Sequence, residues 1–113
     1  MVRISVRLEA ASARTAQDLL DALRFLIPAT QRQAGCLSCN AWTDSTQTVH
    51  YVEEWAAEPD VSRRVRSDAF TRLLSVLELS RNPRVQFDFG TSTRGLDYVV
   101  EERSRDTAPG AGR

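Results

Sequence analysis

In two stretches of the chain hydrophobic residues recur with a period of two, which is the period of a β-strand with one buried face. They are residues 2–8 and residues 49–55. In the second stretch, Tyr51, Glu53 and Trp55 share the face of the strand on which its hydrophobic residues lie. Large aromatic side chains beside a carboxylate, at the end of a strand that leads into a helix, predict the wall of a pocket.

Hydrophobic residues recur every three or four positions in two further stretches, as they do in helices with one buried stripe. In the first helix a capping box opens at Thr15, and we expect Pro28 to kink or restart the helix. Gly35 is placed to end it in a left-handed conformation. The second helix starts at Pro59 and breaks at Ser67, which can cap its second part. The two stripes are Leu19, Leu20, Leu23, Leu26 and Ile27, then Phe70, Leu73, Leu74 and Leu77.

Three more strands are expected from hydrophobic runs that turn residues separate. They are predicted at residues 36–42, 85–89 and 96–102, with a turn at 44–47 and a loop at 90–95. The last strand has the weakest pattern, because two valines are adjacent in it. Residues 104–113 have nothing to bury, so we expect a disordered tail after a domain that spans residues 1–103.

The order strand, helix, strand, strand, helix, strand is that of the ferredoxin-like split βαβ plan. The chain is therefore predicted to be an α+β domain, with an antiparallel sheet and helices on one face. In a domain of 113 residues the other face of the sheet needs cover. We therefore expect a homodimer that packs two sheets together.

Composition excludes several classes of function. The formal net charge is zero, so we expect no nucleic-acid partner and no anionic membrane partner. All 15 basic residues are arginine, which excludes lysine nucleophiles and Schiff bases. No hydrophobic run has the length of a membrane span, and the first ten residues alternate where a signal peptide would be continuously apolar. The expected location is the cytoplasm.

A set of short motifs, in a fixed order, resembles one family. The motifs are Gly35-Cys36-Leu37, Glu53-Glu54-Trp55, Asp60-Val61, Arg66-Ser67, Phe70, Asn82-Pro83 and Gly95-Leu96. Over residues 1–103 they resemble the antibiotic biosynthesis monooxygenase (ABM) domain. The resemblance implies a dimeric α+β barrel with a pocket between sheet and helices. Some members oxidise phenolic or quinol-like substrates with O2 and without a metal or flavin, whereas many have no assigned activity.

Two positions depart from what this resemblance implies. Family members often carry a histidine three residues before the serine that Ser67 matches, and this chain has Arg64 there. A permanent cation thus replaces a titratable acid or base. A haem-degrading branch of the same superfold uses a histidine about one turn after the residue that Phe70 matches. Leu74 occupies that position, so we expect no haem, and no other cofactor or metal is predicted.

Glu53 is the first candidate catalytic residue, and two interpretations of it stay open. As a buried carboxylate it is either paired with an arginine, for which Arg7, Arg64 and Arg66 are candidates, or has a raised pKa. In the second case it would be a general base that takes the proton of a phenol.

Arg64 and Trp55 complete the candidate catalytic set. Arg64 would stabilise a phenolate or a reduced-oxygen anion, unless it is a surface residue in the arginine-rich run of residues 63–66. Trp55 offers an indole donor and a stacking face. The candidate substrate-binding residues are Tyr51, Trp55, Phe70 and Leu74.

The remaining chemical groups favour structural roles. His50 is the only histidine, and it lies on the strand face opposite Trp55. Cys36 and Cys39 have C-x-x-C spacing, but on a strand these positions point to opposite faces, which disfavours a disulfide. Two cysteines and one histidine are too few for a zinc site, so both cysteines are interpreted as small buried residues.

These observations lead to one functional hypothesis and one alternative. The hypothesis is a cofactor-independent monooxygenase-like protein that oxidises a phenolic or quinol-type small aromatic molecule with O2. The alternative is a non-enzymatic, dimeric small-molecule-binding or accessory protein of the same fold.

Overall fold

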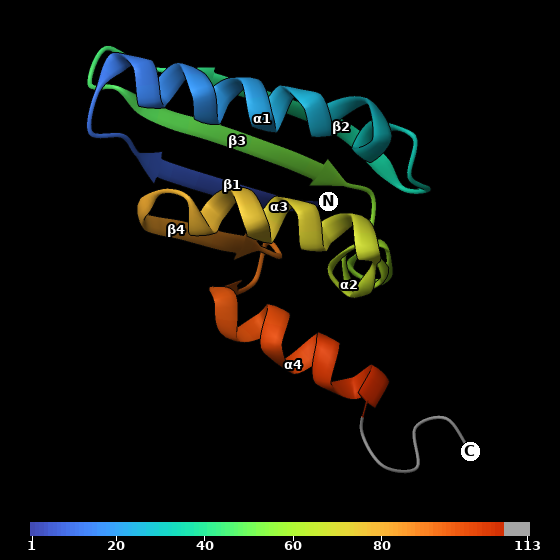
Figure 1. Cartoon of the computed structure of the whole chain (residues 1–113). Coiled ribbons are helices and arrows are strands. Elements are labelled where there is room, and N and C mark those ends of the chain that lie inside the picture. The colour runs from blue at the N-terminus through green and yellow to red at the C-terminus, as the bar shows by residue number, and fades with distance from the viewer. Residues whose placement is uncertain (108–113) are drawn as a thin grey trace.

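The computed structural model describes residues 1–107, and a five-stranded antiparallel sheet forms its centre (Figure 1). The strand order is β2-β3-β1-β4-β5, so the first strand lies in the middle of the sheet. Along the β1–β3 pair, Val2 is opposite Trp55 and Leu8 is opposite Val49. The strands are β1 (Val2–Glu9), β2 (Cys36–Thr43), β3 (Thr48–Trp55), β4 (Arg81–Asp88) and β5 (Thr93–Arg94).

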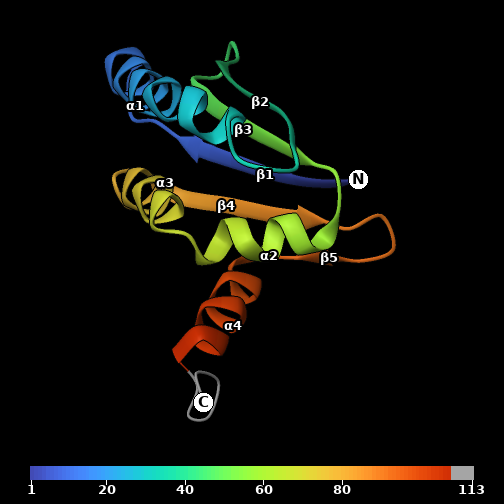
Figure 2. The same cartoon turned by 90° about the vertical axis from the view of Figure 1, so that its right-hand side faces the viewer.

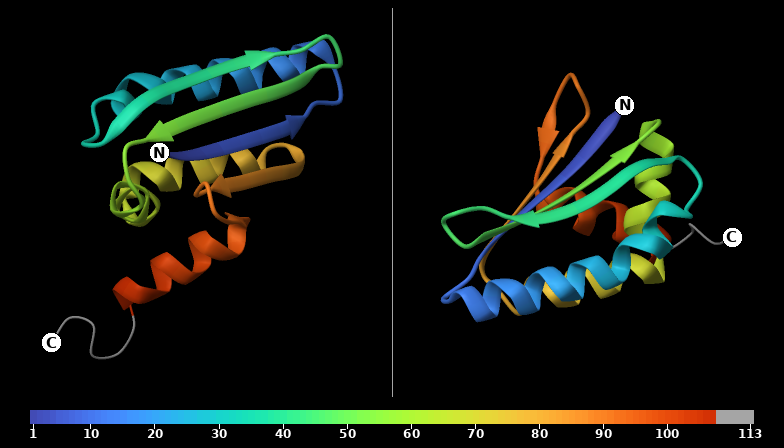
Figure 3. Two further views of the ribbon diagram at one scale, coloured as in Figure 1. Left: turned by 180° about the vertical axis from the view of Figure 1, so that it is seen from behind. Right: turned by 90° about the horizontal axis from the view of Figure 1, so that it is seen from above.

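Four helices accompany this sheet in the described residues. Helices α1 and α3 lie on the same side of the sheet, as Figures 2 and 3 show from three directions, and the hydrophobic core lies between them and the strands. Helix α2 follows β3, and α4 packs mainly against α2. This arrangement confirms the predicted ferredoxin-like α+β fold. The helices are α1 (Ala13–Gln31), α2 (Glu58–Arg66), α3 (Asp68–Glu78) and α4 (Leu96–Thr107).

Helix α1 begins about one turn earlier than the sequence predicts, and it ends at Gln31, before the predicted terminus at Gly35. Its N-cap is Ser12, whose Oγ accepts a hydrogen bond from the backbone nitrogen of Thr15 at 3.1 Å. The predicted capping box at Thr15 is therefore wrong by one turn. The helix continues through Pro28, so the expected restart does not occur. Gly35 has φ +86° in the turn before β2, which confirms its left-handed conformation.

The predicted break in the second helical stretch is confirmed. Helix α2 has Pro59 in its first turn and ends at Arg66, and α3 begins directly after Ser67. The Ser67 Oγ accepts a hydrogen bond from the backbone nitrogen of Phe70 at 3.3 Å, as a capping serine does. The break changes the direction of the chain, so that α2 lies at the end of β3 while α3 packs along the sheet (Figure 1).

The C-terminal part of the sequence-based prediction is wrong. Residues 96–102 were expected to form a fifth strand, but they begin α4, and the short β5 lies inside the predicted loop at 90–95. The buried residues Tyr98, Val99 and Glu102 follow helical spacing, and Arg94 pairs with Asp97 and Glu101 along the same helix. The helix includes residues 104–107 of the expected tail, whereas residues 108–113 lie outside the described residues.

None of the helices in residues 1–107 combines the length and the apolar character that crossing a membrane requires.

Candidate functional site

The carboxylate of Glu53 is fully buried and forms the centre of a hydrogen-bonded cluster. Its Oε1 accepts hydrogen bonds from Trp55 Nε1 at 2.9 Å and from Arg64 Nε at 3.0 Å. Its Oε2 accepts from the Tyr51 hydroxyl at 2.5 Å and from Arg64 Nη2 at 2.8 Å. Each carboxylate oxygen therefore has two donors, which is how a charged carboxylate is stabilised away from water.

Local sequence patterns bring these side chains together. Strand β3 alternates, so Tyr51, Glu53 and Trp55 all point towards the helices and are at most 1% exposed. On α2 the buried residues are Val61, Arg64 and Val65. Spacings of three and four residues define one face of a helix. Arg64 thus lies on the buried face of α2 and faces the Glu53 carboxylate near the end of β3.

Arg64 makes further contacts beyond Glu53. Its Nη2 donates a hydrogen bond to Thr30 Oγ1 of α1 at 3.3 Å, and its guanidinium carbon lies 5.1 Å from the centroid of the Phe70 ring. The Nη1 atom is buried and has no hydrogen-bond partner among the described residues. An unpaired buried donor is costly, so Nη1 is the polar atom of the cluster that is still available to a small molecule.

Burial and charge shift the ionisation of the surrounding groups. Burial is the largest single effect on Arg64 and disfavours its charge, but the hydrogen bonds and the charge of Glu53, together with Tyr51, outweigh burial and raise the pKa of Arg64. Burial raises the pKa of the Tyr51 phenol, and the neighbouring Glu53 charge raises it further. Burial raises the pKa of the Cys39 thiol to about 12. Tyr51 and Cys39 are therefore neutral at physiological pH, and Arg64 is charged.

The geometry distinguishes between the interpretations that the sequence left open. Glu53 is ion-paired with Arg64, and each of its two carboxylate oxygens already accepts two hydrogen bonds. Arg7 cannot be its partner, because it lies on an outward position of β1, and Arg66 donates to the backbone oxygen of Ser62. Arg64 is 1% exposed, so it is not a surface residue of its arginine-rich run.

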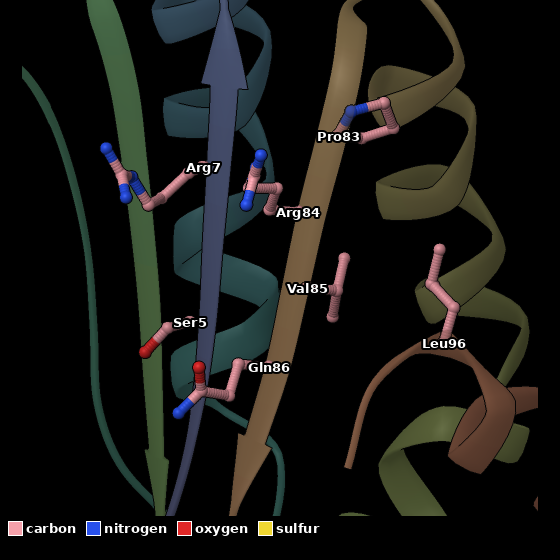
Figure 4. A pocket seen from close by; sticks show the side chains of 7 residues that line it. All are labelled: Ser5, Arg7, Pro83, Arg84, Val85, Gln86 and Leu96. Atoms are coloured by element: carbon pink, nitrogen blue, oxygen red, sulfur yellow. The ribbon is translucent and has the colours of Figure 1, made fainter. Parts of the chain in front are cut away.

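The predicted wall residues are brought together, but they fill the space between them. Tyr51, Trp55 and Phe70 are each at most 1% exposed, and Leu74 is half-buried against the same core. Four hollows on residues 1–107 are lined by other side chains, and Figure 4 shows one of them. In this conformation the cluster is closed, and a ligand reaches Arg64 only if neighbouring side chains move.

The predicted burial is confirmed for Cys39 only, and the β2 bulge places Cys36 opposite Trp55 and Cys39 opposite Glu53, so the expectation that the two cysteines point to opposite faces is wrong. Cys39 is buried and its thiol donates to the Tyr51 hydroxyl at 3.3 Å, whereas Cys36 is half-buried. Within residues 1–107, no group of three or more His, Cys, Asp or Glu side chains is placed to hold a metal ion.

The single histidine has a more specific environment than its sequence context indicates. His50 Nε2 lies 2.8 Å from Asp44 Oδ2, and the imidazole stacks on Trp42 with centroids 5.2 Å apart and planes 11° apart. The hydrogen bond from His50 is the largest of several effects that lower the pKa of Asp44. These residues lie on the face of the sheet away from the helices. Sequence reasoning missed them as a group because only the β2–β3 register places Trp42 opposite His50.

Solved structures share this arrangement of strands and helices. No protein-family profile matches the sequence, and no curated protein is detectably similar in sequence. A Deinococcus radiodurans protein, provisionally named an antibiotic biosynthesis monooxygenase, is 21% identical with a TM-score of 0.67, over 77% of this chain and 89% of its own. Another antibiotic biosynthesis monooxygenase is 18% identical with a TM-score of 0.62, over 77% and 95%. The chain has the fold of the antibiotic biosynthesis monooxygenases.

Proteins without an assigned function share the same fold. A conserved protein from Methanosarcina mazei is 18% identical, with a TM-score of 0.65 over 76% of this chain and 88% of its own. Because identity is this low, the likeness applies to the fold, and the function of this chain has to be argued from its own side chains.

Proposed function

We propose that this protein is a monooxygenase-like protein of the ABM fold that oxidises a small phenolic or quinol-type aromatic molecule with O2. The observation that carries the proposal is the unpartnered, buried Nη1 of Arg64 beside the Phe70 ring. A fixed cation next to an aromatic surface suits a flat substrate on which negative charge develops.

In the proposed reaction the substrate supplies the electrons and needs no bound metal or flavin. A phenol whose oxygen accepts a hydrogen bond from Arg64 Nη1 becomes a phenolate as its proton leaves, because the guanidinium stabilises the anion. The phenolate transfers an electron to O2, and the two radicals combine to form a C–O bond. The O–O bond then breaks. One oxygen atom remains on the ring as a carbonyl group, and the other leaves as water with the two hydrogens that the substrate loses.

Within this scheme the other residues of the cluster position Arg64. Glu53 holds the guanidinium by two parallel hydrogen bonds, and Tyr51 and Trp55 hold Glu53 in turn. Such support fixes the direction of Nη1. Glu53 has no unused acceptor to act as a general base, so the substrate proton has to leave to water or to a group that approaches when the site opens.

Oxygen uptake tests the proposal directly. Metal-free protein is mixed with a panel of hydroquinones and anthrones under ¹⁸O2, and the products are analysed by mass spectrometry. We expect uptake above the buffer rate with one labelled atom per product, and loss of uptake in Arg64→Gln. The control is Arg72→Gln, an exposed arginine on α3. Uptake equal to that of a Glu53→Ala, Trp55→Ala double variant, or unaffected by Arg64→Gln, contradicts the proposal.

One observation favours a second candidate, a non-enzymatic small-molecule-binding or accessory protein. The Glu53 carboxylate is fully occupied, and Arg64 stands where the resemblance implies a histidine. The site therefore has a charge-stabilising group without a free base. A rise in melting temperature with hydroquinones, in the absence of oxygen uptake, supports this candidate over the enzyme.

The homodimer stays a prediction, and it is part of both candidates. It was argued from the sheet face that the helices leave uncovered, and on β1 the outward positions of this face are Arg3, Ser5 and Arg7. A face of this kind tolerates water, so its need for cover is weaker than expected. Light scattering at micromolar protein decides the matter, since a monodisperse monomer contradicts the prediction.

A further inference from the structure

Thr30 is the buried polar residue of α1, and the scheme above gives it no role. It is 2% exposed and lies in the last turn of the helix. The other buried residues of α1 are all hydrophobic, namely Ala16, Leu19, Leu20 and Leu23. A valine would have the same shape at this position without a polar atom to satisfy, and burying a hydroxyl is costly unless it is hydrogen-bonded. The hydroxyl of Thr30 therefore points to a role in hydrogen bonding.

The Thr30 hydroxyl bonds in two directions. It donates its one hydrogen to the backbone oxygen of Leu26, one turn earlier in α1, at 3.0 Å. A hydroxyl has one hydrogen and two lone pairs, so towards its other neighbours Thr30 Oγ1 is an acceptor. It accepts a hydrogen bond from Arg64 Nη2 at 3.3 Å. Because its own helix fixes the hydroxyl hydrogen, the lone pairs of Thr30 are held towards the guanidinium.

The donors of Arg64 are thereby divided between two sides of the guanidinium. Nε donates to Glu53 Oε1, and Nη2 donates both to Glu53 Oε2 and to Thr30 Oγ1. Nη1 is the donor atom that has no partner within residues 1–107. A guanidinium is planar and its N–H groups have a fixed geometry. Once the donors of Nε and Nη2 are held, the direction of Nη1 is determined.

Two elements of the fold hold Arg64 from different directions. Glu53, on β3, binds one edge of the guanidinium, and the group can still tilt about that edge. Thr30, on α1, is 34 residues away from Arg64 in sequence, and its contact restricts the tilt. At 3.3 Å this bond is longer than most N–H···O bonds. Its contribution to stability is therefore smaller than that of the bonds to Glu53, and its main effect is on orientation.

We propose that Thr30 is a positioning residue that directs Arg64 Nη1 towards the substrate. The inference rests on the proposed function, because a substrate oxygen is the group that Nη1 would contact there. The hydrogen of the Thr30 hydroxyl is already used, so Thr30 acts through Arg64. Without the hydroxyl, one hydrogen of Nη2 is unpaired, and the guanidinium tilts away from its alignment with the substrate oxygen. The loss falls mainly on the transition state, since the negative charge develops only as the phenol ionises.

The first test observes the guanidinium itself and depends on no activity. In ¹⁵N-labelled protein, NMR exchange measurements give the rate at which the Nη2 group of Arg64 rotates, since its hydrogen bonds have to break before it turns. Thr30→Val keeps the shape but removes the acceptor, and should speed this rotation at least about fivefold. Thr30→Ser keeps the hydroxyl and should rotate like wild type. The matched control is Thr71→Val, which removes the threonine oxygen that accepts from Arg103 Nη2 at 2.8 Å on the exposed side of α3, and Arg64 should be unchanged in it.

The second test measures oxygen uptake by the same variants with a hydroquinone. Thr30→Val should lower kcat about fivefold to tenfold with little change in KM, and Thr30→Ser should restore most of the rate. The proposal is overturned if the Nη2 group of Arg64 rotates at the wild-type rate in Thr30→Val, or if Thr30→Ser is as impaired as Thr30→Val. It is also overturned if wild type consumes oxygen and Thr30→Val does so equally fast. If wild type consumes none, the proposed oxidation fails, and the rotation rates alone decide whether Thr30 positions Arg64.

Discussion

Replacing Glu53 by glutamine removes the charge at the centre of the buried cluster while keeping the shape of the side chain. Arg64 then remains as a cation with 1% of its surface exposed and without a counter-charge. The amide NH2 group also takes the place of Oε2, which accepts hydrogen bonds from the Tyr51 hydroxyl and Arg64 Nη2. An NH2 group cannot accept from these two donors. Removing one partner of a buried ion pair costs about 3–5 kcal/mol, because the other charge stays buried.

A loss of this size is large for a single domain. Domains are stable by about 5–15 kcal/mol, so Glu53→Gln removes a third or more of the stability of a protein in the middle of that range. At about 4 °C per kcal/mol for a chain of this length, the melting temperature falls by about 12–20 °C. Replacing both partners, as in Glu53→Met with Arg64→Met, leaves no unpaired charge and should cost less than the sum of the two single changes.

Urea unfolding followed by tryptophan fluorescence measures these differences, since Trp55 is buried and hydrogen-bonded to Glu53. Glu54→Gln is the matched control. It is the same substitution one residue further along β3, and its side chain is bonded on the outer face to Arg3 and Ser38. We expect a much smaller loss there, because solvent screens that pair. Equal losses at the two positions, or single changes that add without coupling, refute the reasoning.

Three further predictions concern other parts of the fold. Gly35→Ala should lower the urea midpoint, because φ is +86° and the new Cβ would clash with the carboxyl group of Asp60. The left-handed backbone alone costs about 1–2 kcal/mol. Asp44→Asn should destabilise the protein near neutral pH and progressively less in acid. The pKa of Asp44 is lowered in the fold, so its contribution is present above the ordinary carboxyl range and is lost as pH falls through the folded pKa. Tyr98→Ala should lower the free energy of unfolding by about 3 kcal/mol and loosen α4 in circular dichroism melts. The Tyr98 side chain is 5% exposed and packs on the rings of Phe87, in β4, and Phe89, just after it.

Most of the fold could be predicted because its elements follow simple periods. The alternation in β3 identifies Tyr51, Glu53 and Trp55 as one face, and that face is the buried one. The strand predicted at residues 96–102 is wrong, and its pattern was weak because the adjacent Val99 and Val100 fit neither period clearly. The helix there depends on side chains that cap and bridge it. The nitrogen of Gly95 donates to Asp97, and Arg94 pairs along the first turns.

The sequence pattern only partly indicated that Arg64 is buried. Its run of three arginines within four residues is typical of a solvated helix face. The informative signal was the position of Arg64 in the helical period. Val61 lies three residues before Arg64 and Val65 one residue after it, and both valines are fully buried. The partner of Arg64 is 11 residues away in sequence, across the strand-to-helix turn, so the pairing itself depends on tertiary structure.

Access to the buried cluster on the inner face of the sheet depends on how completely its polar atoms satisfy one another. On the inner face the polar atoms bond to one another, and Arg64 Nη1 is the exception among the described residues. A substrate there has to open a packed core before it meets a charge, so entry depends on local motion.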